Sequence, residues 1–391
     1  MDVKQEAREH LTRKLIPFWA GLLDEQNGGY IGYVDFDLHP DPKADKGCIL
    51  NSRILWFFSR AYTALGGGEL LRCARHAYAF MDSFWDREQG GVYWSCTYSG
   101  QPLDTMKHTY AQSFAIYALS AFAVATGEPE PLRRAMALYE LIETRMKDEI
   151  GYLEAFDRSF KPLDNQKLSD NPKLMARGLV AEKTMNTMLH VLEAYTSLYE
   201  AGRDERVKAS LRKLLLTIGE KVYNRRDNRL EVFFDPQLHS IFNMQSYGHD
   251  IEASWLIDLA ARAVLDPEER SVTALWTSRL ANGVLTRAFR NGSLLNECAE
   301  GEEDATRIWW VQAETAVGIV NLWQKTGEAC LLNMLDQQWR YIQTTLVDPR
   351  EGSEWYWCVD ANGTPERKPI VEPWKCPYHN GRMCLELMAR L

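Results

Sequence analysis

The sequence predicts an all-α protein, an (α/α)6 barrel of six inner and six outer helices whose pairs are joined by short β-hairpins at one face. Three observations favour this fold. A hairpin-like pattern recurs six times, and two helix-length apolar segments separate consecutive copies. One lone helix precedes the first copy, and another follows the last. A single domain over residues 1–391, closed by its own ends, accounts for the whole chain; two separate helical domains are the alternative.

The recurring pattern is a Gly or Arg, then alternating aromatic and polar residues, then a turn rich in Asp, Gly or Pro. Such alternation running into turn residues is typical of a β-hairpin. The copies begin at Gly28, Gly90, Gly151, Arg229, Gly292 and Gly352. Their spacing is roughly 60 residues, except where residues 164–178 form an inserted loop between the third and fourth copies. We assign that loop no chemistry beyond that of a lid.

Helical periodicity fills the intervals between the hairpins. Residues 49–65 and 69–85 form one pair of segments with apolar residues at helical spacing, and residues 108–127 and 131–146 form the next. Together with the lone helices before Gly28 and after Pro377, these pairs add up to twelve helices. Because the two ends supply one pair between them, a closed ring is expected.

Composition and charge narrow the classes of function. A net charge of -9 offers no positive field to attract nucleic acid, so a neutral ligand is the better partner. The 13 Trp and 17 Tyr suit the faces of sugars. The first residues do not resemble a signal peptide and no long apolar run occurs, so we expect a cytoplasmic protein without a membrane partner. The eight cysteines form no C-x-x-C pair, which favours reduced thiols.

In such a ring the first helix after each hairpin begins at the same mouth, so its opening turns are the place to look for a site. These openings contain Arg53; His108 and Tyr110; Asn186 and His190; His249 and Glu252; Arg307, Trp309, Trp310 and Glu314; and His379 and Arg382. Asn186 with His190, and His249 with Glu252, lie at spacings that share one helix face. For any single position the alternative is a capping or core residue; the convergence of six equivalent positions indicates a site.

Three histidines and an arginine suit proton transfer on a neutral, hydroxyl-rich molecule. Histidine gains and loses protons near neutral pH, as a general acid or base must. Two imidazoles on opposite faces of one carbon can remove a proton from one side and return it on the other, which inverts that centre. The carbon must be acidified by an adjacent carbonyl, and Arg53 is the candidate for stabilising the resulting enediolate oxygen.

Other interpretations of the same residues remain open. His190, His249, Glu252 and His379 could hold a divalent metal for a hydride-shift isomerase. Glu252 and Glu314 could serve as the paired carboxylates of a glycosidase. The tryptophans could also form the platform of a non-catalytic oligosaccharide binder. Cys376, His379 and Cys384 match no common zinc spacing, and we expect neither a metal nor a cofactor.

Six stretches carry a family resemblance. They are KGCILNSRILWFFSRAY, DTMKHTYAQSFAIYALS, KTMNTMLHVLEAYTSLY, SYGHDIEASWL, IWWVQAE and PWKCPYHNGRMC. Together they touch every inner helix start, and they resemble the cellobiose branch of the N-acylglucosamine 2-epimerase superfamily. The resemblance implies a cofactor-free (α/α)6-barrel enzyme, favours a monomer, and implies a disaccharide substrate. Its implied reaction is inversion of C2 in the reducing-end glucose of β-1,4-linked disaccharides, from cellobiose to glucosyl-mannose and from lactose to epilactose.

The resemblance also implies roles for particular residues. His249 and His379 would be the acid/base pair at C2, one of them also assisting ring opening. His190 and Arg53 would contact the oxygens on C1 and C2, and His190 is counted with the catalytic residues. The substrate-binding residues would be Asn186 and Glu252, which position the sugar, and Tyr110, Trp309 and Trp374, which line the pocket. We add His108 to the substrate-binding set because of its place at a helix opening.

Overall fold

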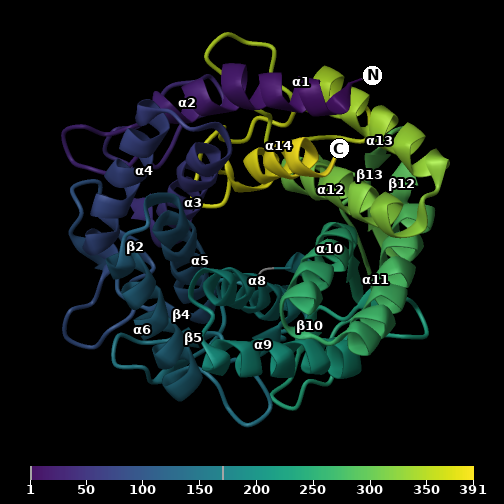
Figure 1. The fold of residues 1–391 in the computed structure, drawn as a ribbon, viewed down its shortest axis with the longest axis horizontal. Helices are drawn as coiled ribbons and strands as arrows, with labels where there is room; N and C mark the ends of the chain where they lie inside the picture. Colours follow the sequence, from purple (N-terminus) through teal and green to yellow (C-terminus); the bar gives the residue numbers. More distant parts are fainter. Residues whose placement is uncertain (1, 170) are drawn as a thin grey trace.

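The computed structural model describes residues 2–169 and 171–391, and it shows a ring of helices two layers deep (Figure 1). Over these residues six helices make the inner layer and six make the outer layer, so the predicted (α/α)6 barrel is confirmed. The inner helices are α3 (Cys48–Leu65), α5 (Thr109–Thr126), α8 (Met185–Gly202), α10 (Tyr247–Val264), α12 (Trp309–Thr326) and α14 (Tyr378–Arg390). Five outer helices are α4 (Gly68–Phe80), α6 (Pro129–Arg145), α9 (Glu205–Thr217), α11 (Pro267–Ala288) and α13 (Ala329–Tyr341).

The sixth outer helix comes from the amino terminus and closes the ring. It is built from α1 (Val3–His10), the π-helical turn η1 (Leu11–Leu15) and α2 (Ile16–Ala20), and α1 packs against α14. Each inner helix contacts the next around the circle, and α14 returns to α3. The two ends of the chain therefore lie close together, as the labels N and C show (Figure 1).

Short helical turns end three outer helices, and one further helix lies in the inserted loop. These are η2 (Met81–Phe84), η3 (Ile218–Val222), η4 (Ile342–Leu346) and α7 (Pro172–Ala176). The inserted loop predicted at residues 164–178 includes Asp170, which lies outside the described residues. Asn171 caps α7, since its side chain accepts hydrogen bonds from the backbone N–H groups of Lys173 and Leu174.

All the strands are two or three residues long and pair antiparallel. They are β1 (Lys46–Gly47), β2 (Ser95–Cys96), β3 (Pro102–Asp104), β4 (Lys107–His108), β5 (Ala155–Phe156), β6 (Pro162–Leu163), β7 (Lys183–Thr184), β8 (Tyr223–Asn224), β9 (Arg229–Leu230), β10 (Phe233–Phe234), β11 (Met244–Ser246), β12 (Phe289–Arg290), β13 (Ser293–Leu294), β14 (Glu297–Ala299), β15 (Glu302–Asp304), β16 (Arg307–Ile308) and β17 (Cys358–Val359).

The strands link neighbouring repeats around the mouth of the ring. The strand that leads into each inner helix pairs with the hairpin of the next repeat: β1 with β2, β4 with β5, β7 with β10, β11 with β14 and β16 with β17. The last link is a bridge between Val34 and Val371, which joins the first hairpin to the segment before α14. The hairpins thus form a second closed circuit above the helices.

Side-chain composition explains which helices are inside. The inner helix α5, TYAQSFAIYALSAFAVAT, carries no charged residue, as a helix enclosed by neighbours requires. Its outer partner α6, PEPLRRAMALYELIETR, buries Ala135, Leu138 and Ile142 and leaves charged residues facing outward. Burial of the inner helices on every side is the main source of stability in such a ring.

Two glutamines, one on α5 and one on α12, hydrogen-bond to the backbone of the segment that follows an outer helix. Gln112 donates from Nε2 to the carbonyl of Val92 (2.8 Å) and accepts from its N–H (2.7 Å). Gln312 makes the same two bonds with Leu294, at 2.7 and 2.9 Å. These amides satisfy buried backbone groups that no strand partner reaches, so they set the height of the hairpins over the helices.

Ion pairs of a buried lysine lie beneath four of the six hairpin links within the described residues; their carboxylates are buried except that of Asp148, which is partly exposed. Each uses a lysine two or three residues before an inner helix and a carboxylate at a turn. The pairs are Lys46 with Asp24 (2.7 Å), Lys107 with Asp86 (3.0 Å), Lys183 with Asp148 (2.6 Å) and Lys375 with Glu354. The corresponding residues before α10 and α12 are Gln245 and Arg307. Removing one partner of a buried pair costs about 3–5 kcal/mol, so the lysines hold the mouth together.

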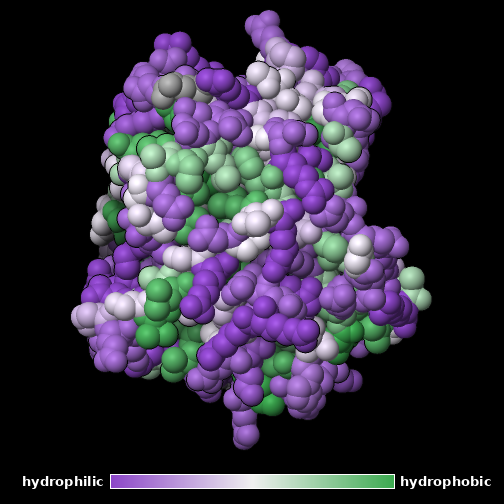
Figure 2. Space-filling model, turned by 90° about the vertical axis from the view of Figure 1, so that its right-hand side faces the viewer, coloured by the Kyte–Doolittle hydropathy of each residue, from purple (hydrophilic) through white to green (hydrophobic). Residues whose placement is uncertain are grey.

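The outer surface is mainly hydrophilic on the side drawn in Figure 2. Figure 2 shows the side of the ring with purple hydrophilic residues over most of its area and green hydrophobic residues gathered in islands. Among the described residues, no helix has both the length and the apolar character needed to cross a membrane.

Glycines permit the closest contact between inner helices, and this gives a first prediction. A Cβ added at Gly318 of α12 would lie 2.4 Å from Ile251 Cγ1 of α10. We expect Gly318→Ala to lower the free energy of unfolding by about 1–3 kcal/mol through overpacking, although alanine favours helix. At Gly219 an added Cβ would meet only Trp276, at 3.8 Å, so Gly219→Ala should be neutral or stabilising. Urea midpoints of the two variants measure this, and equal shifts would contradict the packing argument.

Candidate active site

The inner helices enclose a cavity of about 640 Å³ at the face where the hairpins lie. Nine of the ten predicted residues line it: Arg53, Tyr110, Asn186, His190, His249, Glu252, Trp309, Trp374 and His379. They come from all six inner helices and from the segment before α14. The six helix openings therefore converge on one place, as the sequence predicted, while the role of each residue remains a prediction.

His108 is the exception, and its predicted contact with substrate is corrected. It is the last residue of β4 and the N-cap of α5, where its Nδ1 accepts a hydrogen bond from the backbone N–H of Tyr110 (3.2 Å). Its Nε2 pairs with Asn165 Oδ1 at 3.2 Å, and the ring is fully buried outside the cavity lining. Burial lowers its pKa to about 4. The capping role turns the imidazole away from the cavity.

His379 is held by a carboxylate on the neighbouring helix. Its Nδ1 lies 2.8 Å from Glu314 Oε1. We assign the proton to Nδ1, because Glu314 already accepts hydrogen bonds from Arg382 (2.8 Å) and Trp255 (3.1 Å). This leaves the Nε2 lone pair free for the cavity. Burial lowers the pKa of His379 well below 6.5, and the charges of Arg53 and Arg382 lower it further, so the ring is neutral and able to accept a proton.

His249 lies beside the same tryptophan as His379. Its ring is 4.7 Å from the ring of Trp310, and the ring of His379 is 5.5 Å from that tryptophan. Its Nδ1 lies 2.7 Å from Ser246 Oγ, which fixes the ring at the start of α10. Burial, with the neighbouring His190, lowers its pKa to about 3. Two neutral imidazoles thus contact one indole.

The indole approaches α10 closely because residue 248 is a glycine. A Cβ built there would lie 2.5 Å from the Trp310 ring and 2.7 Å from Val311. Any side chain at this position would move Trp310, and with it the surface that His249 and His379 share.

Arg382 connects the histidines to three buried carboxylates. Its guanidinium donates to Glu193, Glu252 and Glu314. Glu193 in turn lies 3.0 Å from the Nδ1 of His190, as Glu314 lies beside His379. One cation therefore positions the two acids that orient two histidines, an outer-shell arrangement that fixes ring orientation and tautomer.

The carboxylates of this network differ in their proton affinities. Burial would raise the pKa of Glu193, but Arg382 and His190 hold it at about 2. Burial raises the pKa of Glu252 to about 7, with a contribution from the charge of Glu314, and burial also raises the pKa of Glu314 to about 7. The network therefore holds three carboxyl groups and one guanidinium, so the single positive charge of Arg382 cannot balance all three carboxyl groups in their ionised form.

The network also bears on the metal and glycosidase interpretations. Ligand atoms of Glu252, Glu314 and His379 lie within 4.8 Å of one another, a spacing that a metal ion could use. The guanidinium of Arg382 already binds one oxygen of each carboxylate. The place of a bridging cation is therefore taken by a side chain, and the two carboxylates are not free on opposite sides of a bond as a glycosidase requires.

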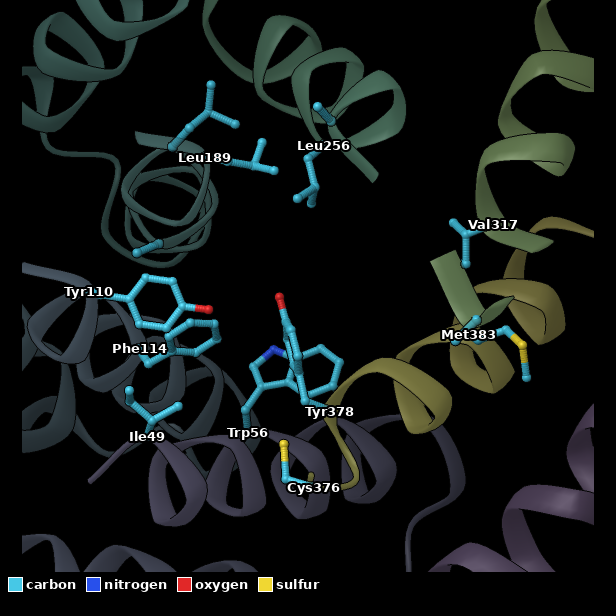
Figure 3. Packing of buried hydrophobic residues seen from close by; sticks show 14 of the residues in the cluster. Ile49, Trp56, Tyr110, Phe114, Leu189, Leu256, Val317, Cys376, Tyr378 and Met383 are labelled. Atoms are coloured by element: carbon cyan, nitrogen blue, oxygen red, sulfur yellow. The ribbon is translucent and has the colours of Figure 1, made fainter. Parts of the chain in front are cut away.

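Arg53 is fixed by aromatic side chains in the interior of the ring. Its guanidinium lies 4.2 Å from the Phe114 ring and 4.9 Å from the Tyr378 ring, and it donates to the hydroxyl of Tyr110 at 3.0 Å. Figure 3 shows Tyr110, Phe114 and Tyr378 gathered where α3, α5 and α14 meet. A cation held in this way is preorganised for an oxygen on which negative charge develops.

Several polar atoms in the cavity lining have no partner among the described residues. They are Asn186 Oδ1, Glu252 Oε2, Trp309 Nε1 and Arg53 Nε. Buried polar atoms are rarely left unsatisfied unless a ligand or water completes them. Two donors and two acceptors are therefore left unpaired in side chains that form the cavity wall.

The inserted loop forms part of the cavity wall. Leu168, Asn171 and Pro172 line it, and Asn171 Nδ2 donates to Glu297 Oε1 at 3.1 Å. Lys173 is paired with Glu302 on β15. The loop therefore reaches the hairpin of the fifth repeat, a position that suits the lid predicted from the sequence.

Sequence reasoning missed the acids behind the histidines. Glu193 was not singled out, and Glu314 was considered only as a hydrolytic carboxylate. A signal was present, since Glu193 follows His190 by three residues within an apolar helical run, where an unpaired glutamate would be costly. Arg382 follows His379 at the same spacing.

Comparison with known proteins agrees with this geometry. Residues 29–380 match the N-acylglucosamine 2-epimerase (GlcNAc 2-epimerase) family. The chain belongs to this family. A cellobiose 2-epimerase of Dictyoglomus turgidum is 46% identical over 100% of this chain and 99% of that protein. One from Ruminococcus albus is 47% identical over 98% of each chain.

A solved structure of a family member matches along the whole barrel. The cellobiose 2-epimerase of Bacillus thermoamylovorans B4167 superposes with a TM-score of 0.95 at 42% identity, covering 99% of both chains. That family member therefore has the same ring from end to end.

Removing Arg382 tests the network directly. We expect Arg382→Leu to lower the free energy of unfolding by about 3–5 kcal/mol at pH 7.5, because three buried carboxylates lose their cation. The loss should shrink towards pH 5. Carboxyl pKa values above the unfolded value make the folded variant bind more protons than the unfolded chain, so it gains stability as the pH falls.

Urea midpoints at several pH values measure this, with Arg60→Leu on the exposed end of α3 as the control. That control should lose little stability at any pH. A penalty for Arg382→Leu that stayed constant with pH would rule out unpaired carboxylates as its cause.

Proposed function

We propose that this protein is a cellobiose 2-epimerase, which reversibly inverts C2 of the reducing-end glucose in β-1,4-linked disaccharides. Cellobiose would give glucosyl-mannose, and lactose would give epilactose. The observation that carries the proposal is the pair formed by His249 and His379. Both imidazoles line one cavity, both contact Trp310, and each has its Nδ1 engaged by another side chain.

The reaction follows from these positions. After ring opening, one imidazole removes the C2 proton, and the electron pair moves into the C1 carbonyl to give an enediolate. Arg53 stabilises the negative charge on its oxygen, and His190 contacts the neighbouring oxygen. The opposite imidazole, which has taken up a proton from solvent, returns that proton to the other face of C2, and the first imidazole releases its own to solvent. As the C1 carbonyl re-forms, the electron pair of the enediolate forms the new C2–H bond, so no oxidant or reductant is consumed.

Binding of the sugar is assigned to the rest of the lining. Asn186 and Glu252 offer unpaired oxygens to hydroxyl groups, and Trp309 offers an unpaired N–H. Trp374 and Tyr110, whose rings lie 5.9 Å apart, present aromatic surface to the apolar face of a pyranose. The relatives named above support cellobiose as the substrate.

Isotope exchange separates this mechanism from its alternatives. In heavy water the protein should convert cellobiose into its C2 epimer with solvent deuterium at C2, because the proton passes through exchangeable imidazoles. NMR locates the label and mass spectrometry follows the product. A hydride shift would leave C2 without solvent label, hydrolysis would give monosaccharides, and a binding protein would give no product; each of these outcomes would contradict the proposal.

Substitution of the two histidines tests their assignment. We expect His249→Ala and His379→Ala each to lower kcat by about a hundredfold or more, the usual size of general acid–base catalysis, with the helical circular dichroism retained. His39→Ala, at a side chain that is 79% exposed on the first hairpin, is the matched control and should keep full activity. Wild-type turnover in either cavity variant would remove that residue from the mechanism.

A further inference from the structure

A second hollow lies on the outside of the ring, between the end of α13 with η4 and the hairpins of the fifth and sixth repeats. Its volume is about 410 Å³, and it shares no lining residue with the catalytic cavity. Its described lining is mostly hydroxyl and amide side chains, including Ser293, Thr344, Thr345 and Asn362. Arg307 is the only charged residue among them.

Arg307 stands where other repeats have a paired lysine. Its equivalents Lys107 and Lys46 bind the carboxylates of Asp86 and Asp24. The residue that corresponds to Asp86 is Arg290, because Asp86 follows the bridged residue Trp85 just as Arg290 follows Phe289 in β12. The fifth repeat has therefore exchanged its carboxylate for a second cation.

No described carboxylate forms a salt bridge with the guanidinium of Arg307, and the charge of Asp304 acts on it only from beyond that distance. Its Nε donates to Ser293 Oγ at 3.1 Å and its Nη1 donates to the carbonyl of Ala305. No described residue pairs with its Nη2 and none forms a salt bridge with it, although the side chain is only 7% exposed. Arg290 is paired with Glu303 instead. A cation with little access to water and no ion partner is costly unless an anion joins it.

We propose that this outer hollow is a binding site for a small oxyanion, namely inorganic phosphate or the phosphate group of a sugar phosphate. The planar guanidinium matches phosphate oxygens through its free N–H groups. Hydroxyl and amide groups around it can donate further hydrogen bonds, and no carboxylate in the described lining repels the ligand. With a net charge of -9, the protein as a whole offers no general attraction for anions, so binding must come from this local arrangement.

Thermal unfolding of the whole protein in phosphate and in chloride, at equal ionic strength, tests the site. A ligand that binds the folded state raises the midpoint in proportion to the logarithm of its concentration once the site is saturated. We expect such a rise in phosphate and none in chloride, with isothermal titration calorimetry giving the affinity. This readout needs no turnover, so it is independent of the proposed function.

Variants locate the site. Arg307→Gln should weaken phosphate binding by about tenfold or more, the loss of hydrogen bonds from a charged donor. Because that change is buried, two further variants alter the exposed residue Thr344 at the rim. Thr344→Glu should weaken phosphate binding through repulsion. Thr344→Gln, whose side chain has the same size without the charge, should retain it. Arg340→Gln removes an exposed arginine of α13 outside the lining and should also retain binding.

Each result of these experiments either supports or overturns the proposed oxyanion site. A phosphate-specific rise that Thr344→Glu loses and Thr344→Gln keeps supports the site, even if Arg307→Gln does not fold. Tighter binding of glucose 1-phosphate than of phosphate would assign the site to phosphorylated sugars, and the reverse order would assign it to the free ion. No rise in the wild-type protein, or equal rises in both Thr344 variants, would overturn the proposal.

Discussion

The buried guanidinium of Arg382 is the interaction on which the catalytic geometry depends. It sits among Glu193, Glu252 and Glu314, where taking charges out of water is expensive and only mutual pairing compensates. Because two of these acids hold His190 and His379, the same contacts that offset the cost of burial also orient the imidazoles. Stability and function therefore draw on one set of hydrogen bonds, and neither can be altered at this point without the other.

This network is completed only by the last helix of the chain. Arg382, His379 and Tyr378 all lie on α14, whereas Glu193, Glu252 and Glu314 lie on α8, α10 and α12. The carboxylates meet their cation once α14 docks between α12 and α3, with α1 behind it. Assembly of the site and closure of the ring are thus the same event, and the strand bridge between Val34 and Val371 secures it at the mouth.

The sequence revealed the repeat, and so the fold, because hairpin chemistry and helical periodicity are local. It also revealed which side chains meet, since equivalent helix openings face one mouth. The prediction that His108 contacts substrate was wrong, and the reason is also local: at the N-cap its ring accepts a hydrogen bond from the helix backbone. Glu193 left a local signal at three residues from His190, whereas the role of Arg382 escaped because pairing between distant helices leaves no spacing in the chain. The hollow beside Arg307 likewise needed the three-dimensional comparison of repeats.

The absent side chain at residue 248 has a consequence for how this enzyme can evolve. Trp310 fills the space that even a methyl group would need, and two histidines rest on that indole. Even alanine is therefore excluded at this position, although Gly248 itself has no role in the reaction. Changes in sugar preference must arise instead from the hairpins and the loop at the rim, where side chains can be exchanged without moving the indole.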